Sequence, residues 1–217
     1  MNVLPLLTAF TAGLAHAIEP DHVAAVTTFV SRRPKPLEAV GFGLRWGIGH
    51  SMAILVVGGI LIALDLNVPD NVTRGLEFGV GMMLLGLGLW LLWNVLHERA
   101  HRLAGDASHA HGAHGHHHHD HRHGSLWVGL AHGLAGTAPF IAVIPVALVK
   151  SPWQAGAYLL LFGVGTTIAM GIYALVAGVV FHHAGNRLPA LGGVLRAATA
   201  VGSAALGVLW MVSALGA

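Results

Sequence analysis

The chain has 217 residues, of which 55% are hydrophobic and only 9% are charged, and its formal net charge is +2. Soluble domains carry about 25% charged residues, so this composition excludes an ordinary soluble domain and predicts an integral membrane protein. The small charge gives no sign of a nucleic-acid-binding surface, and the absence of cysteine excludes disulfides and thiolate metal sites.

Six apolar segments are long enough to cross a bilayer, because a spanning helix needs about 20 apolar residues. We therefore predict an all-α membrane protein with about six transmembrane helices. The first segment is too long for a signal-peptide core and lacks its basic flank and cleavage signature, so we expect it to be retained. The six segments are 3–30, 37–64, 74–96, 125–148, 154–181 and 190–215.

The first segment, 3–30, contains two imidazoles and two carboxylates: His16, Glu19, Asp21 and His22. A carboxylate at bilayer depth costs roughly 2.5–3.5 kcal/mol, so ionisable groups there indicate function. Imidazole and carboxylate without thiol suit Ni²⁺, Co²⁺ or Zn²⁺. We predict that His16, Asp21 and His22 bind a metal ion, and that Glu19 takes part in metal binding or proton coupling.

Pro20 predicts a break in this first helix. In an unbroken helix His16, Asp21 and His22 would point in different directions. Proline removes a backbone hydrogen bond and clashes with the preceding turn, and an unwound stretch would bring the three side chains together around a cavity. The alternative is a helix that ends near Ile18, which would leave the acidic residues and His22 in a loop at the membrane surface.

The next two segments each add one candidate. His50 lies in the middle of 37–64, and we expect it to be a fourth metal ligand, with a hydrogen-bonded structural histidine as the alternative. Glu77 lies one turn inside 74–96, close to Arg74. An ordinary i, i+3 surface pair and a role in proton or metal handling both account for it.

The segment 97–124 contains eleven of the seventeen histidines and is otherwise rich in glycine and alanine. Such a tract cannot bury a core, so we expect a mobile loop. Its imidazoles predict weak, multivalent binding of Ni²⁺, Co²⁺, Cu²⁺ or Zn²⁺, which is lost below about pH 6.5. The alternative is a hydrophilic linker without a required sequence. The crowded histidines are His109, His111, His114, His116, His117, His118, His119, His121 and His123.

The chain repeats itself after this loop. Gly13-Leu14-Ala15-His16 recurs as Gly129-Leu130-Ala131-His132, and the segment 47–53 recurs at 163–169, with an offset of 116 residues in both cases. We predict two repeats, 1–96 and 125–217, joined by the histidine-rich loop 97–124. Because each repeat holds three spans, an odd number, the second is inverted relative to the first, as in many transporters.

His132 follows the repeated Gly-Leu-Ala, but Ala135, Gly136 and Thr137 come after it in place of the acidic pair. We expect it to be a secondary ligand or a proton-coupling group, or else a packing residue.

The distribution of Lys and Arg predicts the orientation of the chain. Seven of these residues follow spans 1, 3 and 5, and two lie on the other side. We therefore expect a multi-pass protein of the cell (inner or plasma) membrane, with the histidine-rich loop in the cytoplasm and both termini outside. The seven are Arg32, Arg33, Lys35, Arg99, Arg102, Arg122 and Arg187, and the two are Arg74 and Lys150.

The residues His16-x₄-Asp21-His22 resemble the signature of the nickel–cobalt transporter (NiCoT, or NicO) superfamily. Gly47-Ile48-Gly49-His50-Ser51 resembles its second motif, and the segment 129–138 is similar to compact six-span permeases of the UreH type. This resemblance implies passage of Ni²⁺, and also of Co²⁺, as transported substrates, without a permanently bound cofactor, through His16, Asp21, His22 and His50.

The same resemblance implies the lipid bilayer and divalent ions as partners, and a cytoplasmic nickel acceptor such as a urease or hydrogenase maturation protein. The chain departs from the family signature at Glu19 and Pro20, where small residues are usual. The additional carboxylate is expected to affect metal preference.

Several functions remain open at this point. The leading one is transmembrane transport of nickel, and cobalt, through the intramembrane His/Asp site. The transport alternatives are a nickel/cobalt exporter and a zinc carrier, which raw affinity cannot separate. A membrane metalloenzyme is a weaker alternative, because His-Glu-x-x-His is absent and only His97-x₃-His101 and His182-His183 resemble histidine boxes. A metal sensor would keep the loop without needing buried ligands.

Overall fold

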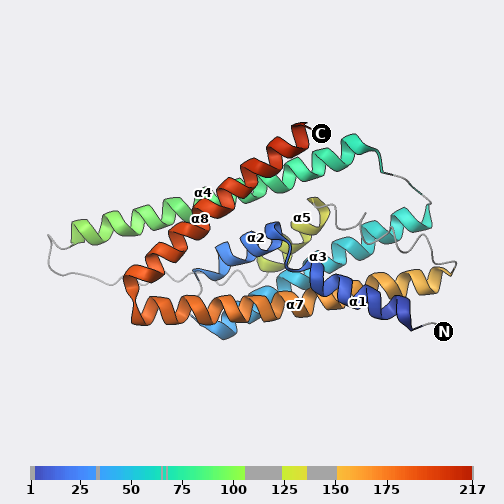
Figure 1. Ribbon diagram of the computed structural model, residues 1–217, viewed down its shortest axis with the longest axis horizontal. Helices are drawn as coiled ribbons and strands as arrows, with labels where there is room; N and C mark the ends of the chain where they lie inside the picture. Colours follow the sequence, from blue (N-terminus) through green and yellow to red (C-terminus); the bar gives the residue numbers. More distant parts are fainter. Residues whose placement is uncertain are drawn as a thin grey trace.

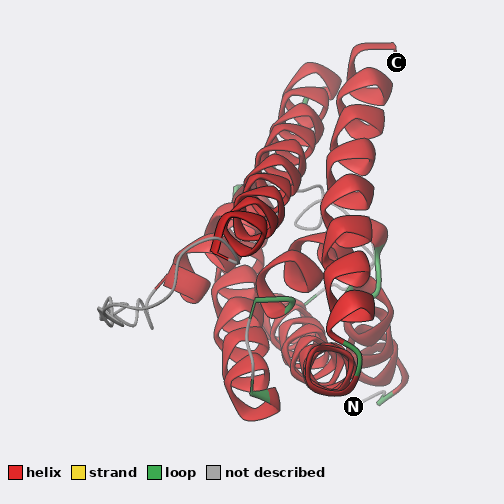
Figure 2. Ribbon diagram, turned by 90° about the vertical axis from the view of Figure 1, so that its left-hand side faces the viewer, coloured by secondary structure: helices red, strands yellow, loops and turns green. Residues whose placement is uncertain are grey.

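The computed structural model describes residues 3–32, 35–64, 66, 68–105, 124–135 and 151–216. Within these ranges every regular element is a helix, as Figures 1 and 2 show. The nine crowded histidines of the loop, from 109 to 123, and the end of the expected fourth span lie outside the described residues. The helices are α1 (Leu4–His16), α2 (Pro20–Val30), α3 (Pro36–Ala63), α4 (Asp70–Gly105), α5 (Gly124–Ala135), α7 (Pro152–Arg187) and α8 (Pro189–Gly216).

Four of the described helices, α3, α4, α7 and α8, are long and apolar enough to cross a membrane. Large apolar side chains lie exposed on these helices, among them Trp93 and Val212. In water such a surface would be unfavourable, but it suits contact with lipid tails. The prediction of a helical membrane protein is thus confirmed, whereas α1, α2 and α5 are shorter pieces.

Two of these helices extend beyond the expected spans. α4 begins at Asp70 rather than 74 and continues to Gly105 rather than 96, and α7 continues to Arg187 rather than 181. Hydropathy marks only the part of a helix that contacts lipid, while backbone hydrogen bonds and polar side-chain pairs continue the helix into water.

The predicted break in the first span lies where Pro20 placed it. α1 ends at His16 and α2 begins at Pro20, while Glu19 between them has an extended backbone (φ −61°, ψ 147°). A residue before proline is pushed out of the helical region, and proline is favoured at the first helical position because it has no N–H to leave unpaired. The same sequence therefore ends one helix and starts the next.

The helices pack as two long pairs with the short pieces between them. α3 packs against α7, α4 crosses α8, α1 lies on α7 and α5 lies on α3, and Figure 1 shows α2 and α5 between the two pairs. Glycines permit the closest approaches. A Cβ on Gly13 would lie 2.0 Å from the carbonyl oxygen of Phe162, and one on Gly129 would lie 2.0 Å from that of Trp46. Small residues allow such backbone contact in membranes.

Candidate metal site

Three histidines from three helices converge at the break between α1 and α2. The Nε2 atom of His50 lies 3.2 Å from that of His16 and 3.3 Å from that of His22. All three side chains are buried, and their ligand atoms lie within 4.8 Å of one another. The structure thus brings together three of the predicted ligands; we call them the histidine cluster.

The helix ends and packing contacts place these side chains. His16 is the last residue of α1, and His22 lies in the first turn of α2, so the break turns both toward the same point. His50 occupies the middle of α3. Gly13 brings α1 against α7 one turn before His16, and Gly129 brings α5 against α3 one turn before His132.

The spacing within the cluster suits an ion better than hydrogen bonds alone. A neutral imidazole nitrogen either donates one proton or accepts with one in-plane lone pair, so His50 Nε2 cannot make good hydrogen bonds to both neighbours. With metal–nitrogen bonds of about 2.0–2.1 Å, two nitrogens of a tetrahedral site lie about 3.3 Å apart and two adjacent nitrogens of an octahedral site about 3.0 Å apart. The two distances to His50 fall in this range.

Asp21 lies next to the cluster and contacts two imidazoles. Its Oδ1 lies 2.8 Å from Nδ1 of His22, and its Oδ2 lies 3.1 Å from Nε2 of His132. With the carboxylate ionised, both nitrogens donate to it. His22 then carries its proton on Nδ1, and the lone pair of its Nε2 is free for a metal ion.

Glu19 lies close to His16, without the hydrogen bond that joins Asp21 to His22. Its Oε1 lies 2.9 Å from His16 Nδ1, and its side chain is 44% exposed. Two carboxylates therefore lie beside the three imidazoles, and ionised carboxylates there would compensate the charge of a divalent cation.

Two aromatic residues that the sequence analysis did not single out line the cluster. The Trp46 ring stacks on His50, with centroids 5.1 Å apart and an interplanar angle of 5°, and the Phe162 ring lies 5.4 Å from His16. Trp46 precedes His50 by one helical turn, which was the available signal. Phe162 was detectable only as the residue at the offset of 116 from Trp46.

Other predicted residues lie apart from the cluster. Among the described residues, two groups of side chains are close enough to hold a metal ion, and Glu77 belongs to neither of them. No ion pair within the described residues joins Glu77 to Arg74. Glu77 is half-buried on α4. The pair His97 and His101 lies near the end of α4, with its Nε2 atoms 3.0 Å apart.

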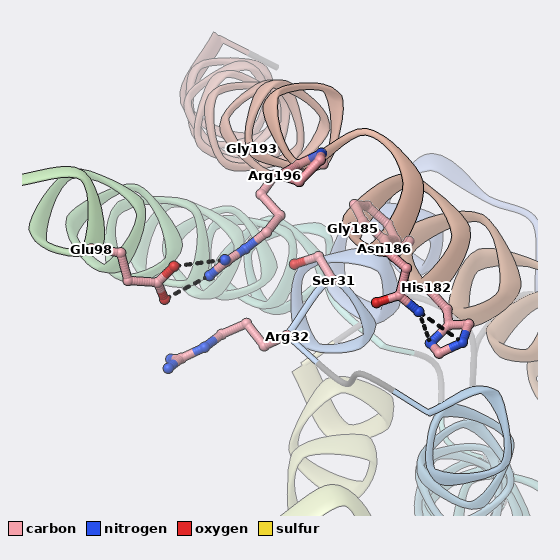
Figure 3. Close-up of a pocket in the computed structure, with 11 residues that line it drawn as sticks. Ser31, Arg32, Glu98, His182, Gly185, Asn186, Gly193 and Arg196 are labelled. Atoms are coloured by element: carbon pink, nitrogen blue, oxygen red, sulfur yellow. Dashed lines mark hydrogen bonds and ion pairs between the residues drawn. The ribbon is translucent and has the colours of Figure 1, made fainter. Parts of the chain in front are cut away.

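A cavity of about 360 Å³ opens between the ends of α2, α4, α7 and α8, where His182 lines it, rather than at the histidine cluster. Figure 3 shows Arg196 paired with Glu98 through two hydrogen bonds of 2.7 and 2.9 Å, with Arg32 beside them. The wall of this cavity carries the charges of Arg32 and Arg196 against that of Glu98, and it contains none of the residues of the histidine cluster. The side chains of the histidine cluster are buried.

Comparisons with known proteins agree on one family. The model of the family described as NicO, high-affinity nickel-transport protein, matches residues 4–202. A protein named urease accessory protein UreH, from Bacillus sp. (strain TB-90), is 31% identical over 182 residues, which cover 83% of this chain and 79% of that protein. A protein of Methanocaldococcus jannaschii named for nickel/cobalt efflux is 25% identical over 78% of this chain and 74% of its own length.

More distant similarity extends to a plant protein. The chloroplast protein for growth and fertility 2 of Arabidopsis thaliana is 25% identical over 95% of this chain, which corresponds to 55% of that protein. No solved structure matches the chain significantly.

Proposed function

Because the chain belongs to the NicO family of high-affinity nickel-transport proteins, we propose that it carries Ni²⁺, and also Co²⁺, through the histidine cluster. The family is one of metal-ion transporters, so the metalloenzyme alternative is set aside. The observation that carries the proposal is the convergence of three Nε2 atoms, from His16, His22 and His50, at the break between α1 and α2. These two short helices pack against the membrane-capable helices α7 and α8.

The chemistry of the cluster suits a borderline divalent ion. Three imidazoles are ligands for Ni²⁺, Co²⁺ and Zn²⁺, whereas Mg²⁺ and Ca²⁺ prefer oxygen. A buried ion is costly unless its charge is compensated, and the carboxylates of Asp21 and Glu19 lie one imidazole away from the proposed position. The negative charges of these carboxylates would compensate most of the charge of the bound ion.

We assign Asp21 and His132 a positioning role. Both oxygens of Asp21 already contact imidazoles, and one of these is the second-half histidine, His132. Through this carboxylate, α5 fixes the ring of His22. The group of Asp21, His22 and His132 is also compact enough for a metal ion, and it is the alternative resting place for the cargo.

The arrangement of contacts supports two inverted repeats. The contact of Gly13 with Phe162 becomes the contact of Gly129 with Trp46 when each residue is replaced by its counterpart at the offset of 116. A two-fold axis between two halves requires such an exchange. The same exchange relates the contact of Gly49 with Leu126 to that of Gly165 with Phe10.

The axis of this proposed symmetry would pass between Ser51 and Thr167. These residues are themselves 116 apart, and their hydroxyl oxygens lie 3.1 Å from each other at the contact of α3 with α7. A two-fold rotation exchanges the two members of a residue pair that lies on the axis, so the two must occupy equivalent positions in the two repeats. Movement of the two halves about this contact would expose the cluster to one side and then to the other.

We propose a cell-membrane location with the histidine-rich segment in the cytoplasm. The start of α1 and the end of α8 lie in the right half of Figure 1, whereas α4 ends at its left. Relatives named for urease accessory function and for nickel/cobalt efflux are both similar to the chain. The proposal therefore includes both uptake and export as directions of transport, and a cytoplasmic nickel acceptor belongs to the uptake hypothesis.

The test is cellular nickel content, measured by elemental mass spectrometry in a host without its own nickel transporters. The intact chain is compared with His50→Gln, and with His183→Gln as the matched control, since His183 is exposed on α7, away from the cluster. A rise in nickel that His50→Gln abolishes and His183→Gln preserves establishes uptake through the cluster. A fall that follows the same pattern establishes export.

The proposal fails if membrane-inserted protein changes the cellular content of none of Ni²⁺, Co²⁺ and Zn²⁺. If His50→Gln transports as well as the intact chain, the histidine cluster is not the transport site, although the protein is still a transporter. Size-exclusion chromatography of the purified variants separates a lost site from a misfolded protein.

A further inference from the structure

A second pair of facing imidazoles lies on α4, away from the histidine cluster. His97 and His101 are one helical turn apart, both are exposed, and their Nε2 atoms lie 3.0 Å from each other. The rings meet edge to face, with centroids 4.4 Å apart and an interplanar angle of 85°. The Trp93 ring stacks on His97 from the preceding turn, with centroids 6.3 Å apart, which limits the orientations open to His97.

We propose that His97 and His101 form a surface chelate for a divalent transition-metal ion. Two histidines at i and i+4 present their nitrogens from one helix face, the spacing by which helices hold zinc in metalloproteases. With metal–nitrogen bonds of about 2.1 Å, two adjacent positions of an octahedral ion are about 3.0 Å apart. The observed distance between the Nε2 atoms has this value.

The position of the pair on α4 gives an ion access from water. α4 has 36 residues and is about 54 Å long at 1.5 Å per residue, so it exceeds the hydrocarbon core of about 30 Å. Trp90 and Trp93 lie one turn or more before His97, and tryptophan is enriched at the membrane boundary. The pair therefore stands at or beyond that boundary, at the end of α4 opposite Asp70.

The chemistry of the two imidazoles determines which metal ions the pair can bind. Two neutral imidazoles suit Ni²⁺, Co²⁺, Cu²⁺ and Zn²⁺, and the exposed rings leave the remaining coordination positions to water. The neighbouring carboxylate, Glu98, pairs with Arg196 on α8, so the chelate would consist of nitrogen ligands alone. Because the protein supplies only two ligands, we expect the pair to bind its ion with moderate affinity. Such a site can both take up and release the ion.

The test is equilibrium dialysis of the full-length protein in detergent against Ni²⁺. The background variant has the nine histidines between 109 and 123 replaced by asparagine, so that they do not contribute. Into this background we introduce His97→Gln, His101→Gln and, as the matched control, His183→Gln. We expect each change in the pair to weaken the binding of one ion by at least about tenfold, while His183→Gln leaves it unchanged.

A rescue variant separates chelation from a structural effect. His101→Gln combined with Ala100→His moves the second imidazole to i+3, which still shares a helix face with His97, so the lost ion should return. If His97→Gln and His101→Gln bind as many Ni²⁺ ions as the background with equal affinity, the pair is only hydrogen-bonded and the inference is wrong. The readout is binding, so it is independent of whether the histidine cluster transports.

Discussion

Asp21 and His132 are 111 residues apart in the chain, yet the Asp21 carboxylate lies 3.1 Å from Nε2 of His132. The other oxygen of the same carboxylate lies 2.8 Å from Nδ1 of His22. One side chain at the start of α2 thus links a histidine of the cluster to a histidine of α5. A movement of α5 relative to α2 would therefore shift the Asp21 carboxylate and, with it, the imidazole ring of His22.

Asp21→Asn tests this link with little change in volume. The amide has one oxygen to accept and an NH₂ that only donates, so His22 and His132 cannot both keep their present hydrogen bonds. If the proton of His22 moves to Nε2, the lone pair needed by the ion is lost. We expect metal affinity at the cluster to fall about 10- to 100-fold, measured by Co²⁺ titration of purified protein lacking the loop histidines.

The matched control for this change is Asp70→Asn. Asp70 is an exposed carboxylate in the first turn of α4, so its replacement should leave Co²⁺ affinity within about twofold of the parent value, as expected for a surface change with no contact to the site. Equal loss in both variants would show that the effect is one of net charge rather than of the Asp21 hydrogen bonds.

Gly129→Ala tests the packing that places His132. The added Cβ would lie 2.0 Å from the carbonyl oxygen of Trp46, so α5 and α3 must move apart. We expect a loss of about 1–3 kcal/mol of stability, as for other overpacked contacts, seen as a lower melting temperature in detergent. Gly86→Ala is the control, because nothing lies within 4 Å of its new Cβ; it should be neutral or up to about 1 kcal/mol more stable.

The ion pair between α4 and α8 is open to a charge-swap experiment. Arg196 donates to both oxygens of Glu98, at 2.7 and 2.9 Å. Because Glu98 is partly exposed, we expect Glu98→Gln to cost only about 1 kcal/mol, measured from thermal unfolding in detergent. The double variant Glu98→Arg/Arg196→Glu should recover part of the loss, and a double variant less stable than both single changes would contradict the pairing.

The histidine-rich segment should bind metal in a pH-dependent way. A protonated imidazole has no lone pair for a metal, so binding falls as pH decreases through the usual imidazole pKa of about 6.5. We expect the intact chain to retain several Ni²⁺ ions at pH 7.5 and to release most of them at pH 5.5, measured by equilibrium dialysis. A deletion of residues 105–123 should lack this fraction at both pH values. Equal retention by the deletion variant would place the binding elsewhere.

Local sequence rules were enough to predict the helical membrane fold and the break in the first span. Long apolar runs can satisfy their backbone only as helices in lipid, and Pro20 acts on its immediate neighbours. The helices α4 and α7 extend beyond their predicted apolar segments because hydropathy follows lipid contact, while helix ends follow hydrogen bonding. His16, His22 and His50 were chosen as candidates because ionisable groups are costly in a membrane, whatever their partners.

The amino-acid sequence alone specifies which groups are available to bind a metal ion: imidazoles and carboxylates, without thiols, beside a proline. Which of their atoms meet depends on the folded structure. It directs the Nε2 atoms of His16, His22 and His50 toward one another, turns Asp21 toward His22 and His132, and brings Trp46 against His50. These contacts depend on how closely helices approach across the fold, as at Gly13 and Gly129, and such approaches are set by packing between distant segments that no local pattern contains.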